Sequence, residues 1–222
     1  MFYWQPYIII KNKNPKGFKI PNLNFNYFMK KTLILSTIFL FAFNLRAQKY
    51  ITNNGFIELS GEVPFEYIKA ENIIVESILD PNTGVVKFKT LMKSFHFKLV
   101  EFEEPFNKNF IESDKYPISE FKGIITNIEN INFNKAGSYK ILVEGNLTIH
   151  NVMRKVTHSG IIEVTSEGII ASSKFKLKPE DYNIDLPTIF GKKLAKEIKM
   201  TVKMNYIHMK NNVGLVNASI IK

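Results

Sequence analysis

Residues 139–149 read Tyr-Lys-Ile-Leu-Val-Glu-Gly-Asn-Leu-Thr-Ile, and this stretch decides the fold class. Every second position, from Tyr139 to Ile149, is apolar or glycine. Four of the five positions between them are polar: Lys140, Glu144, Asn146 and Thr148. Because successive side chains of a strand point to opposite faces, this alternation predicts a strand with one apolar and one solvated face. Such strands are typical of antiparallel sheets around a single interior.

Three other stretches show the same alternation. Their apolar positions are Phe95, Phe97 and Leu99; Phe175 and Leu177; and Ile198, Met200, Val202, Met204 and Tyr206. Turn-forming residues separate the apolar runs at 80–84 (Asp-Pro-Asn-Thr-Gly), 135–137 (Lys-Ala-Gly) and 166–168 (Ser-Glu-Gly). The pattern predicts about eight to ten strands, which is enough for a closed barrel or a sandwich.

Two stretches interrupt the strand pattern. Residues 104–113 and 188–196 are predicted to form short helices or ordered loops, the second because Leu194 and Ile198 have helical spacing. No internal repeat or low-complexity linker divides the body. We therefore expect a single domain.

Residues 29–47 have the pattern of a secretory signal peptide. Two lysines come first, an apolar run of about a dozen residues follows, and Ala47 is the small residue at the expected cleavage point. That run is short for a membrane span, which takes ~20 residues. We expect a periplasmic or secreted protein without a transmembrane anchor, and a buried N-terminal helix or a retained anchor is the alternative. With no cysteine in the chain, a lipoprotein anchor is excluded.

Residues 1–28 precede this signal and show no steady period, so we expect no domain there. The simplest account is that translation begins at Met29 and that residues 1–28 are an upstream extension outside the native product. A signal peptide with a longer positive region is the alternative. The barrel domain would then span residues 48–210, and residues 211–222 would form a C-terminal tail.

The formal charge of +10 is unevenly distributed. Residues 1–47 contain seven of the 30 basic residues and no acidic one, so the remaining 23 basic residues face 20 acidic ones, a net of +3. Binding to phosphates needs a clustered excess of positive charge, which the body lacks. Nucleic acid is therefore not an expected partner.

The residues that commonly carry catalysis or bind metals form no known motif. The four histidines (His96, His150, His158 and His208) have no metal-binding spacing, and no nucleophile elbow or phosphate-binding loop is present. His150 and His158 could face each other across a turn at residues 151–154, although two polar residues on a wet strand face are the plainer interpretation. The absence of cysteine excludes thiolate metal sites and disulfides. We predict no catalytic residue and no metal site.

Three segments, the first of them in two parts, carry a resemblance to a known family. Residues 92–97 read Met-Lys-Ser-Phe-His-Phe, and residues 106–117 continue with Phe-Asn-Lys-Asn-Phe-Ile-Glu-Ser-Asp-Lys-Tyr-Pro. Residues 143–150 read Val-Glu-Gly-Asn-Leu-Thr-Ile-His, and residues 177–184 read Leu-Lys-Pro-Glu-Asp-Tyr-Asn-Ile. In this order they resemble the YceI-like family over about residues 50–208. The chain departs from the family pattern at Asn151 and Asn183, where glycine is usual, and at Lys155, where proline is common. Asn tolerates the left-handed conformation, so the turn at Asn151 should survive.

The resemblance implies an all-β fold, a lipocalin-like antiparallel barrel of about eight strands with one or two short helices. It also implies that the interior takes up an isoprenoid or another long lipid-like chain, such as a quinone-like lipid, in a protein that is sometimes a homodimer. An eight-stranded barrel is just wide enough for side chains or one small ligand, and each CH₂ taken from water contributes ~0.8 kcal/mol. The candidate cavity-lining residues are Phe65, Phe95, Phe97, Leu99, Phe121, Leu147, Ile149, Phe175, Tyr182, Met200 and Met204.

The apolar faces alone would also fit a solid core. The predicted function is lipid binding without catalysis or a cofactor. One alternative is an envelope enzyme or redox accessory acting on a membrane-derived isoprenoid, and another is an envelope stress protein with a solid core and protein partners. A solid interior would favour the stress protein, whereas a buried titratable group beside an open cavity would favour the enzyme.

Overall fold

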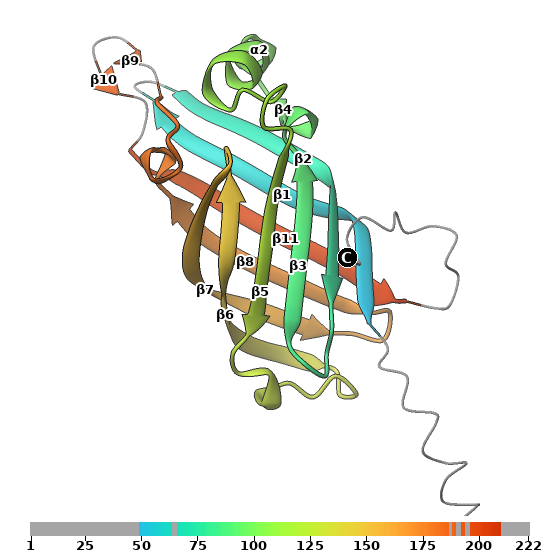
Figure 1. Cartoon of the computed structure of the whole chain (residues 1–222). Coiled ribbons are helices and arrows are strands. Elements are labelled where there is room, and N and C mark those ends of the chain that lie inside the picture. Colours follow the sequence, from blue (N-terminus) through green and yellow to red (C-terminus); the bar gives the residue numbers. More distant parts are fainter. Residues whose placement is uncertain (1–48, 64–65, 187, 190–191, 194–195, 210–222) are drawn as a thin grey trace, which may run out of the picture. The chain divides into compact units, whose positions relative to one another are not determined.

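Eight long antiparallel strands form a closed barrel in the computed structural model, which describes residues 49–63, 66–186, 188–189, 192–193 and 196–209 (Figure 1). The strands are β1 (Tyr50–Val63), β2 (Glu66–Leu79), β3 (Val85–Leu91), β5 (Ile118–Ile125), β6 (Gly137–Ile149), β7 (Val152–Val164), β8 (Ile169–Leu177) and β11 (Ile198–His208). They lie in the order β1-β11-β8-β7-β6-β5-β3-β2, and pairing of β2 with β1 completes the ring. The predicted all-β barrel is confirmed.

The period-two patterns place their apolar residues inside this barrel. On β6, Ile141 and Leu147 are buried, and Tyr139, Val143 and Ile149 pack against the same core. On β11, the interior positions are Met200, Val202, Met204 and Tyr206, all of them buried. The polar residues between them face solvent, so the barrel is built from half-buried strands as the alternation predicts.

The hairpin turns lie where the turn residues predict them. β2 and β3 are joined by residues 80–84, in which Gly84 has a positive φ of 73°. β6 and β7 are joined by only two residues, His150 (φ 51°) and Asn151 (φ 60°). Two-residue hairpins whose central residues both have positive φ match the right-handed twist of the flanking strands.

A segment of short elements, residues 92–117, lies at one end of the barrel and is called the cap (Figure 1). It contains the 3-10 helices η2 (Met92–Ser94) and η3 (Val100–Phe102), the two-residue strand β4 (His96–Phe97), the α-helical turn α2 (Glu103–Pro105) and the π-helical η4 (Phe106–Phe110). The short helix predicted within residues 104–113 is therefore confirmed. Two further 3-10 helices, η5 (Ile128–Asn130) and η6 (Pro179–Tyr182), lie in the β5–β6 loop and after β8.

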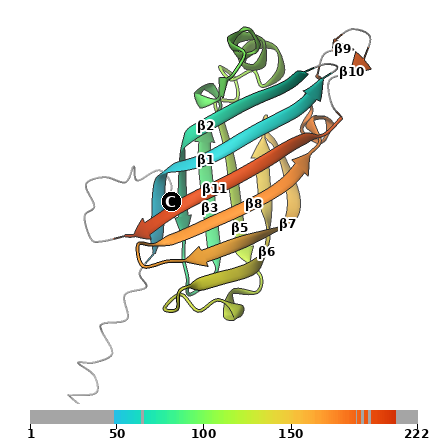
Figure 2. The same cartoon turned by 180° about the vertical axis from the view of Figure 1, so that it is seen from behind.

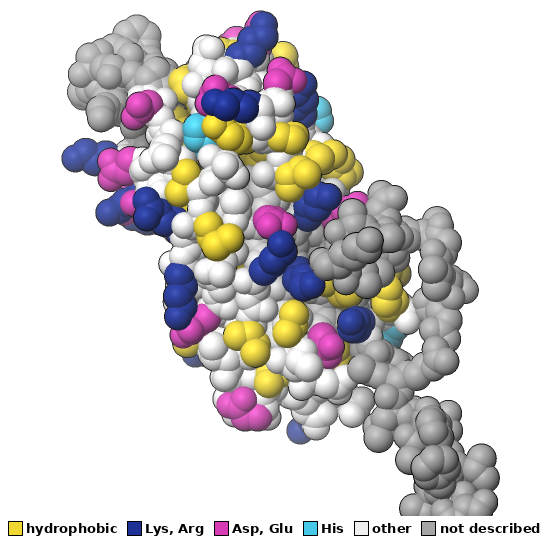
Figure 3. Space-filling model, in the orientation of Figure 1, with side chains coloured by type: hydrophobic (Ala, Val, Ile, Leu, Met, Phe, Trp, Pro, Cys, Tyr) yellow, Lys and Arg dark blue, Asp and Glu magenta, His cyan; other side chains and the backbone are white. Residues whose placement is uncertain are grey.

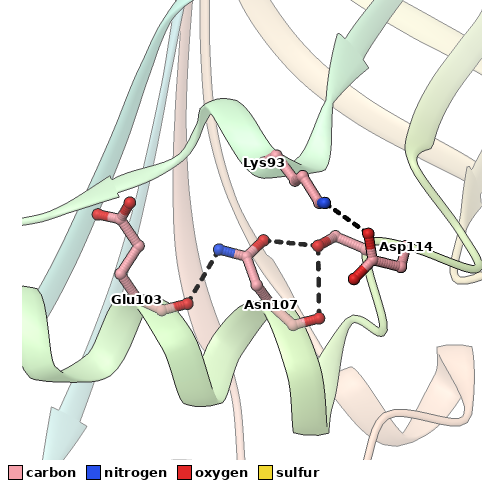
Figure 4. A network of polar contacts seen from close by, with 5 residues as sticks. Lys93, Glu103, Asn107 and Asp114 are labelled. Carbon is pink, nitrogen blue, oxygen red and sulfur yellow. Dashed lines mark hydrogen bonds and ion pairs between the residues drawn. The ribbon is translucent and has the colours of Figure 1, made fainter.

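Polar contacts hold the cap in shape (Figure 4). Asn107 Nδ2 donates to the Glu103 carbonyl oxygen at 2.9 Å, and Ser113 Oγ donates to Asn107 Oδ1 at 2.7 Å. Lys93 on η2 forms an ion pair with Asp114. These contacts join residues within the cap to one another.

Two predictions are wrong. The alternation of Phe95, Phe97 and Leu99 yields only the two-residue β4, because Phe95 follows the 3-10 helix η2 and Leu99 precedes η3. The helical spacing within residues 188–196 does not give a helix, because the described residues pair as the short strands β9 (Thr188–Ile189) and β10 (Lys192–Lys193). Of the two interpretations of the histidines, the facing pair is not formed, because His150 lies in the turn itself and His158 lies opposite Val143 on β6.

Two sections of the barrel wall lack a continuous backbone ladder. β2 pairs with β3 only over residues 76–79, and further along it pairs with β4 of the cap instead. β7 pairs with β8 only between residues 161–164 and 169–172, so the two strands share no backbone pairing beyond that point (Figure 2). The first split is covered by the cap. The 3-10 helix η6 lies beside the second, where the Asp181 carbonyl oxygen accepts a hydrogen bond from Arg154 of β7.

Basic and acidic side chains are interspersed on the face shown in Figure 3. Lys69, for example, lies 2.7 Å from both Glu58 and Glu71. No helix among the described residues is long and apolar enough to cross a membrane. The predictions for residues 1–28, the signal peptide at 29–47, the tail at 211–222 and the candidate Phe65 lie outside the described residues.

Candidate functional site

An apolar cavity of about 150 Å³ lies inside the barrel beneath the cap, and we call it the cap-end cavity. Six of the predicted lining residues surround it: Phe95, Phe97, Leu147, Ile149, Phe175 and Met200. Aromatic side chains of the cap form its roof, where the rings of Phe97 and Phe106 lie 5.0 Å apart. An apolar cavity of this size stays dry and takes up apolar guests.

The polar side chains on the wall of the cap-end cavity are already engaged. Thr90 Oγ1 accepts a hydrogen bond from Asn72 Nδ2 at 2.8 Å, and Ser119 Oγ donates to Met92 Sδ at 3.0 Å. Asn72 is fully buried and also donates to the Leu91 carbonyl oxygen at 3.2 Å, so it joins β2 to the end of β3. The cavity therefore offers a ligand an apolar surface and few polar contacts.

A second cavity of about 100 Å³, the far-end cavity, lies deeper in the barrel. Phe121 and Met204 are the predicted residues that line this cavity alone. Four residues line both cavities: Phe88, Leu147, Phe175 and Val202. Because the two cavities share these walls, they adjoin each other along the apolar interior of the barrel.

Two facing glycines make room for a ring in the far-end cavity. Gly123 on β5 pairs with Gly145 on β6, and a Cβ atom added to either would lie within 2.6 Å of the Phe121 ring. Phe121 in turn stacks on Phe88 with ring centroids 5.1 Å apart. The glycines thus allow Phe121 to lie flat against the barrel wall and leave the central space open.

Two titratable side chains line the far-end cavity. Burial lowers the pKa of the His158 imidazole below its ordinary value of 6.5, and the ring stacks on Phe175 at 3.9 Å. Burial raises the pKa of Tyr206 to about 12. Both groups are therefore neutral near pH 7, which suits an apolar interior.

A third hollow lies in the wall between β7 and β8, and we call it the side opening. The predicted residue Tyr182 lies here and not in either cavity. Leu147 and Phe175 line the side opening as well as both cavities. The opening is bordered by four charged side chains: Lys176, Lys178, Asp181 and Glu197. The side chain of Lys176 holds the pKa of the Glu197 carboxyl below its usual range.

The cap is attached to the barrel through His150. Its Nε2 lies 2.9 Å from Glu112 Oε2 of the cap, and its Nδ1 lies 3.2 Å from the Tyr182 carbonyl oxygen. Since a carbonyl oxygen only accepts, Nδ1 is the donor in the second contact. Tyr116 of the cap packs its ring edge against the same imidazole at 4.3 Å. His150 therefore joins the cap, the β6–β7 turn and η6.

A family model for the YceI-like domain matches residues 43–206 of the sequence. The chain belongs to the YceI-like family. A domain from Saccharophagus degradans, described as polyisoprenoid-binding and implicated in plant cell wall breakdown, has the same fold with a TM-score of 0.62 at 8% identity, covering 73% of this chain and 99% of that one. BcnA from Burkholderia cenocepacia has a TM-score of 0.55 at 16% identity, covering 67% of this chain and 94% of that one. No curated protein matches the sequence.

Not every predicted residue of this YceI-like barrel reaches the interior. Leu99 is half-buried in the cap and lines none of the three hollows, and Phe65 is outside the described residues. Sequence reasoning missed the cap roof and the β1–β2 wall: Phe102, Phe106, Phe110, Ile57, Leu59, Ile68 and Ala70. The Phe-rich composition of residues 102–110 was the one signal that could have identified the roof.

Proposed function

We propose that this YceI-like protein is an exported carrier or sequestering protein that holds an isoprenoid or other long apolar chain inside its barrel. The observation that carries the proposal is the apolar interior of the barrel, in which two adjoining cavities share Phe88, Leu147, Phe175 and Val202. A hydrocarbon chain would gain ~0.8 kcal/mol for each CH₂ transferred from water to this interior. The Saccharophagus domain of the same fold is described as polyisoprenoid-binding, which supports this class of ligand.

Export rests on the sequence of residues 29–47, with its paired lysines, apolar run and Ala47. A carrier outside the cytoplasm would meet membrane-derived lipids without being anchored itself. Cell fractionation followed by N-terminal sequencing tests this part of the proposal. Mature protein that begins at Gln48 or Lys49 in the envelope fraction is the expected result, and full-length chain in the cytoplasm would contradict it.

One observation favours the alternative of an enzyme or redox accessory, namely that the titratable His158 lies beside the far-end cavity. Among the described residues, however, no group of three His, Asp or Glu side chains gathers to hold a metal. Two of the other histidines have acidic partners in the cap: Glu103 approaches His96 and Glu112 approaches His150. A histidine without a carboxylate partner fits ligand binding better than acid–base catalysis.

Native mass spectrometry of the purified protein, with organic extraction of bound molecules, tests lipid binding directly. We expect an added mass that is released as a long-chain lipid, and the same spectrum shows whether the protein is a monomer or a homodimer. Titration with a fluorescent prenyl probe should then give saturable binding to the lipid-stripped protein. Absence of saturable binding for every prenyl and acyl chain tested would overturn the proposal.

A further inference from the structure

The side opening is a feature of the barrel wall and not a frayed strand end. The backbone pairing of β7 with β8 ends at Ile161 and Ser172, although β7 continues back to Val152 and β8 continues to Leu177. Beyond that point, β7 remains paired with β6 over its full length, and β8 remains paired with β11. Each edge of the opening is therefore held in place by its other neighbour (Figure 2).

Side chains join the two edges of the opening next to the last backbone pair between β7 and β8. Ser173 Oγ donates a hydrogen bond to the Ser159 carbonyl oxygen at 2.7 Å. Next to it, the imidazole of His158 stacks on the Phe175 ring, with an angle of 16° between the planes. Both rings line the far-end cavity as well as the opening, so the opening adjoins the apolar interior.

The opening has the polar character that the interior lacks. The polar groups of the cap-end cavity, Thr90 and Ser119, already bond to the protein. In contrast, no hydrogen bond to another described residue fixes the imidazole nitrogens of His158, which borders the opening. A long-chain ligand with a polar end therefore finds an available partner at the opening.

The charges at the rim favour an uncharged polar end. Two lysines and two carboxylates border the opening, and one pair, Lys176 with Glu197, is already joined at 2.8 Å. The rim therefore has no net charge with which to attract an ionised head group. A neutral imidazole can instead donate or accept one hydrogen bond with an alcohol or carbonyl oxygen.

We propose that the side opening is a polar subsite at which an uncharged, oxygen-bearing head of the ligand hydrogen-bonds to His158 while its apolar chain fills the barrel. This inference rests on the proposed lipid-binding function and specifies where the head of the ligand lies. It also makes the gap between β7 and β8 the side of the barrel at which the ligand meets solvent.

The test compares three probes with the same C20 prenyl chain: geranylgeraniol, the corresponding hydrocarbon without the hydroxyl, and geranylgeranyl phosphate. We expect His158→Leu to weaken binding of the alcohol about 3- to 10-fold, the effect of one hydrogen bond, and to leave the affinity for the hydrocarbon nearly unchanged. The matched control is His208→Leu, because His208 packs its ring at a tilt against Tyr50 and lines none of the three hollows. It should change neither affinity.

A second measurement locates the head without relying on affinity. A photoreactive group placed at the alcohol end of the chain should label residues 156–158 and 176–178. Labelling of the cap instead, or an equal effect of His158→Leu on alcohol and hydrocarbon, would overturn the subsite and leave barrel binding intact. Tighter binding of the phosphate than of the alcohol would overturn the proposal that the head of the ligand is uncharged. If none of the three prenyl probes binds to the wild-type protein, the proposed lipid-binding function itself is contradicted.

Discussion

At the scale of single residues, the β6–β7 turn depends on two positive φ angles, at His150 and Asn151. Asn151→Gly should leave stability nearly unchanged, because glycine adopts this conformation without steric cost. Asn151→Val should destabilise the protein by about 1–2 kcal/mol, since a β-branched side chain is strained there. Urea unfolding of both variants measures the difference, with Asn146→Val on the exposed face of β6 as the control. Equal midpoints for the Gly and Val variants would contradict the prediction.

Tyr206 makes a buried hydrogen bond whose direction follows from its partner. Ser77 Oγ donates its one proton to the Lys87 carbonyl oxygen at 2.8 Å, so the Tyr206 hydroxyl, 2.7 Å away, must donate to Ser77. Tyr206→Phe should therefore cost about 1 kcal/mol at neutral pH. Burial raises the pKa of Tyr206 from 10.0 to about 12, so the folded state keeps a proton that the unfolded chain releases.

The pH dependence of this contribution has a definite sign. Stability from Tyr206 is fully present below pH 10 and is lost as pH rises toward about 12, because deprotonation favours the unfolded chain. The advantage of wild type over Tyr206→Phe should accordingly shrink in that range. Unfolding midpoints measured from pH 8 to 11.5 report it, and Tyr139→Phe, whose hydroxyl bonds the Lys135 carbonyl oxygen near the surface, is the control. A constant difference across the range would be evidence against this account.

At the scale of elements, the attachment of the cap to the barrel should depend on the contact between Glu112 and His150, whose side chains are 2.9 Å apart. Glu112→Ala removes the acceptor and should speed amide exchange in the cap about 5-fold, the effect of roughly 1 kcal/mol. Glu112→Gln should retain most of the protection, because its amide oxygen can still accept a hydrogen bond from the imidazole Nε2. Hydrogen exchange read by mass spectrometry provides the measurement.

Glu104→Ala serves as the control for the cap, since Glu104 pairs with Lys108 on the exposed side of the same segment. It should leave the exchange of the cap unchanged. If Glu112→Ala and Glu104→Ala exchange alike, the ion pair with His150 does not hold the cap on the barrel.

Sequence reasoning predicted the long strands far better than the short elements. The alternation in residues 139–149 and 198–206 persists over many positions, so it could only fit a strand with one buried face. At Phe95, Phe97 and Leu99 the alternation is too short to exclude other structures, and the chain folds over the barrel end instead. The spacing of Leu194 and Ile198 was misleading, because Ile198 is the first residue of β11.

The candidate site was predicted in part for a related reason. Residues on strands with clear alternation, such as Phe175 and Met200, do line the interior. Ile57 and Leu59 were missed because their face becomes part of the cavity wall only when β1 pairs with both β2 and β11. The side opening had no sequence signal at all, since it arises from backbone pairs that β7 and β8 do not make.

At the scale of the whole molecule, the barrel should bind its ligand through apolar area. Met204→Lys and Phe97→Glu should each abolish uptake of a long prenyl chain and lower stability, because a charge would lie in an apolar interior. Met204→Leu should retain binding and change stability by less than about 1.5 kcal/mol, since the volumes match. Lys203→Glu, exposed on the same strand, controls for the change of charge. Undiminished binding by both charged interior variants would mean that the chain does not enter the barrel.

The pairing of β1 with β11 joins the two ends of the described barrel, with Tyr50 opposite His208. Contacts between distant parts of a chain form slowly, because most of the chain must be ordered before they can form. Until β11 is in place, β1 and β8 each expose a strand edge that can pair with another molecule. Ring closure is therefore expected to be the slow, aggregation-sensitive step of folding. A chain that ends before Ile198 should be recovered mainly as insoluble aggregate and not as a barrel with weaker affinity.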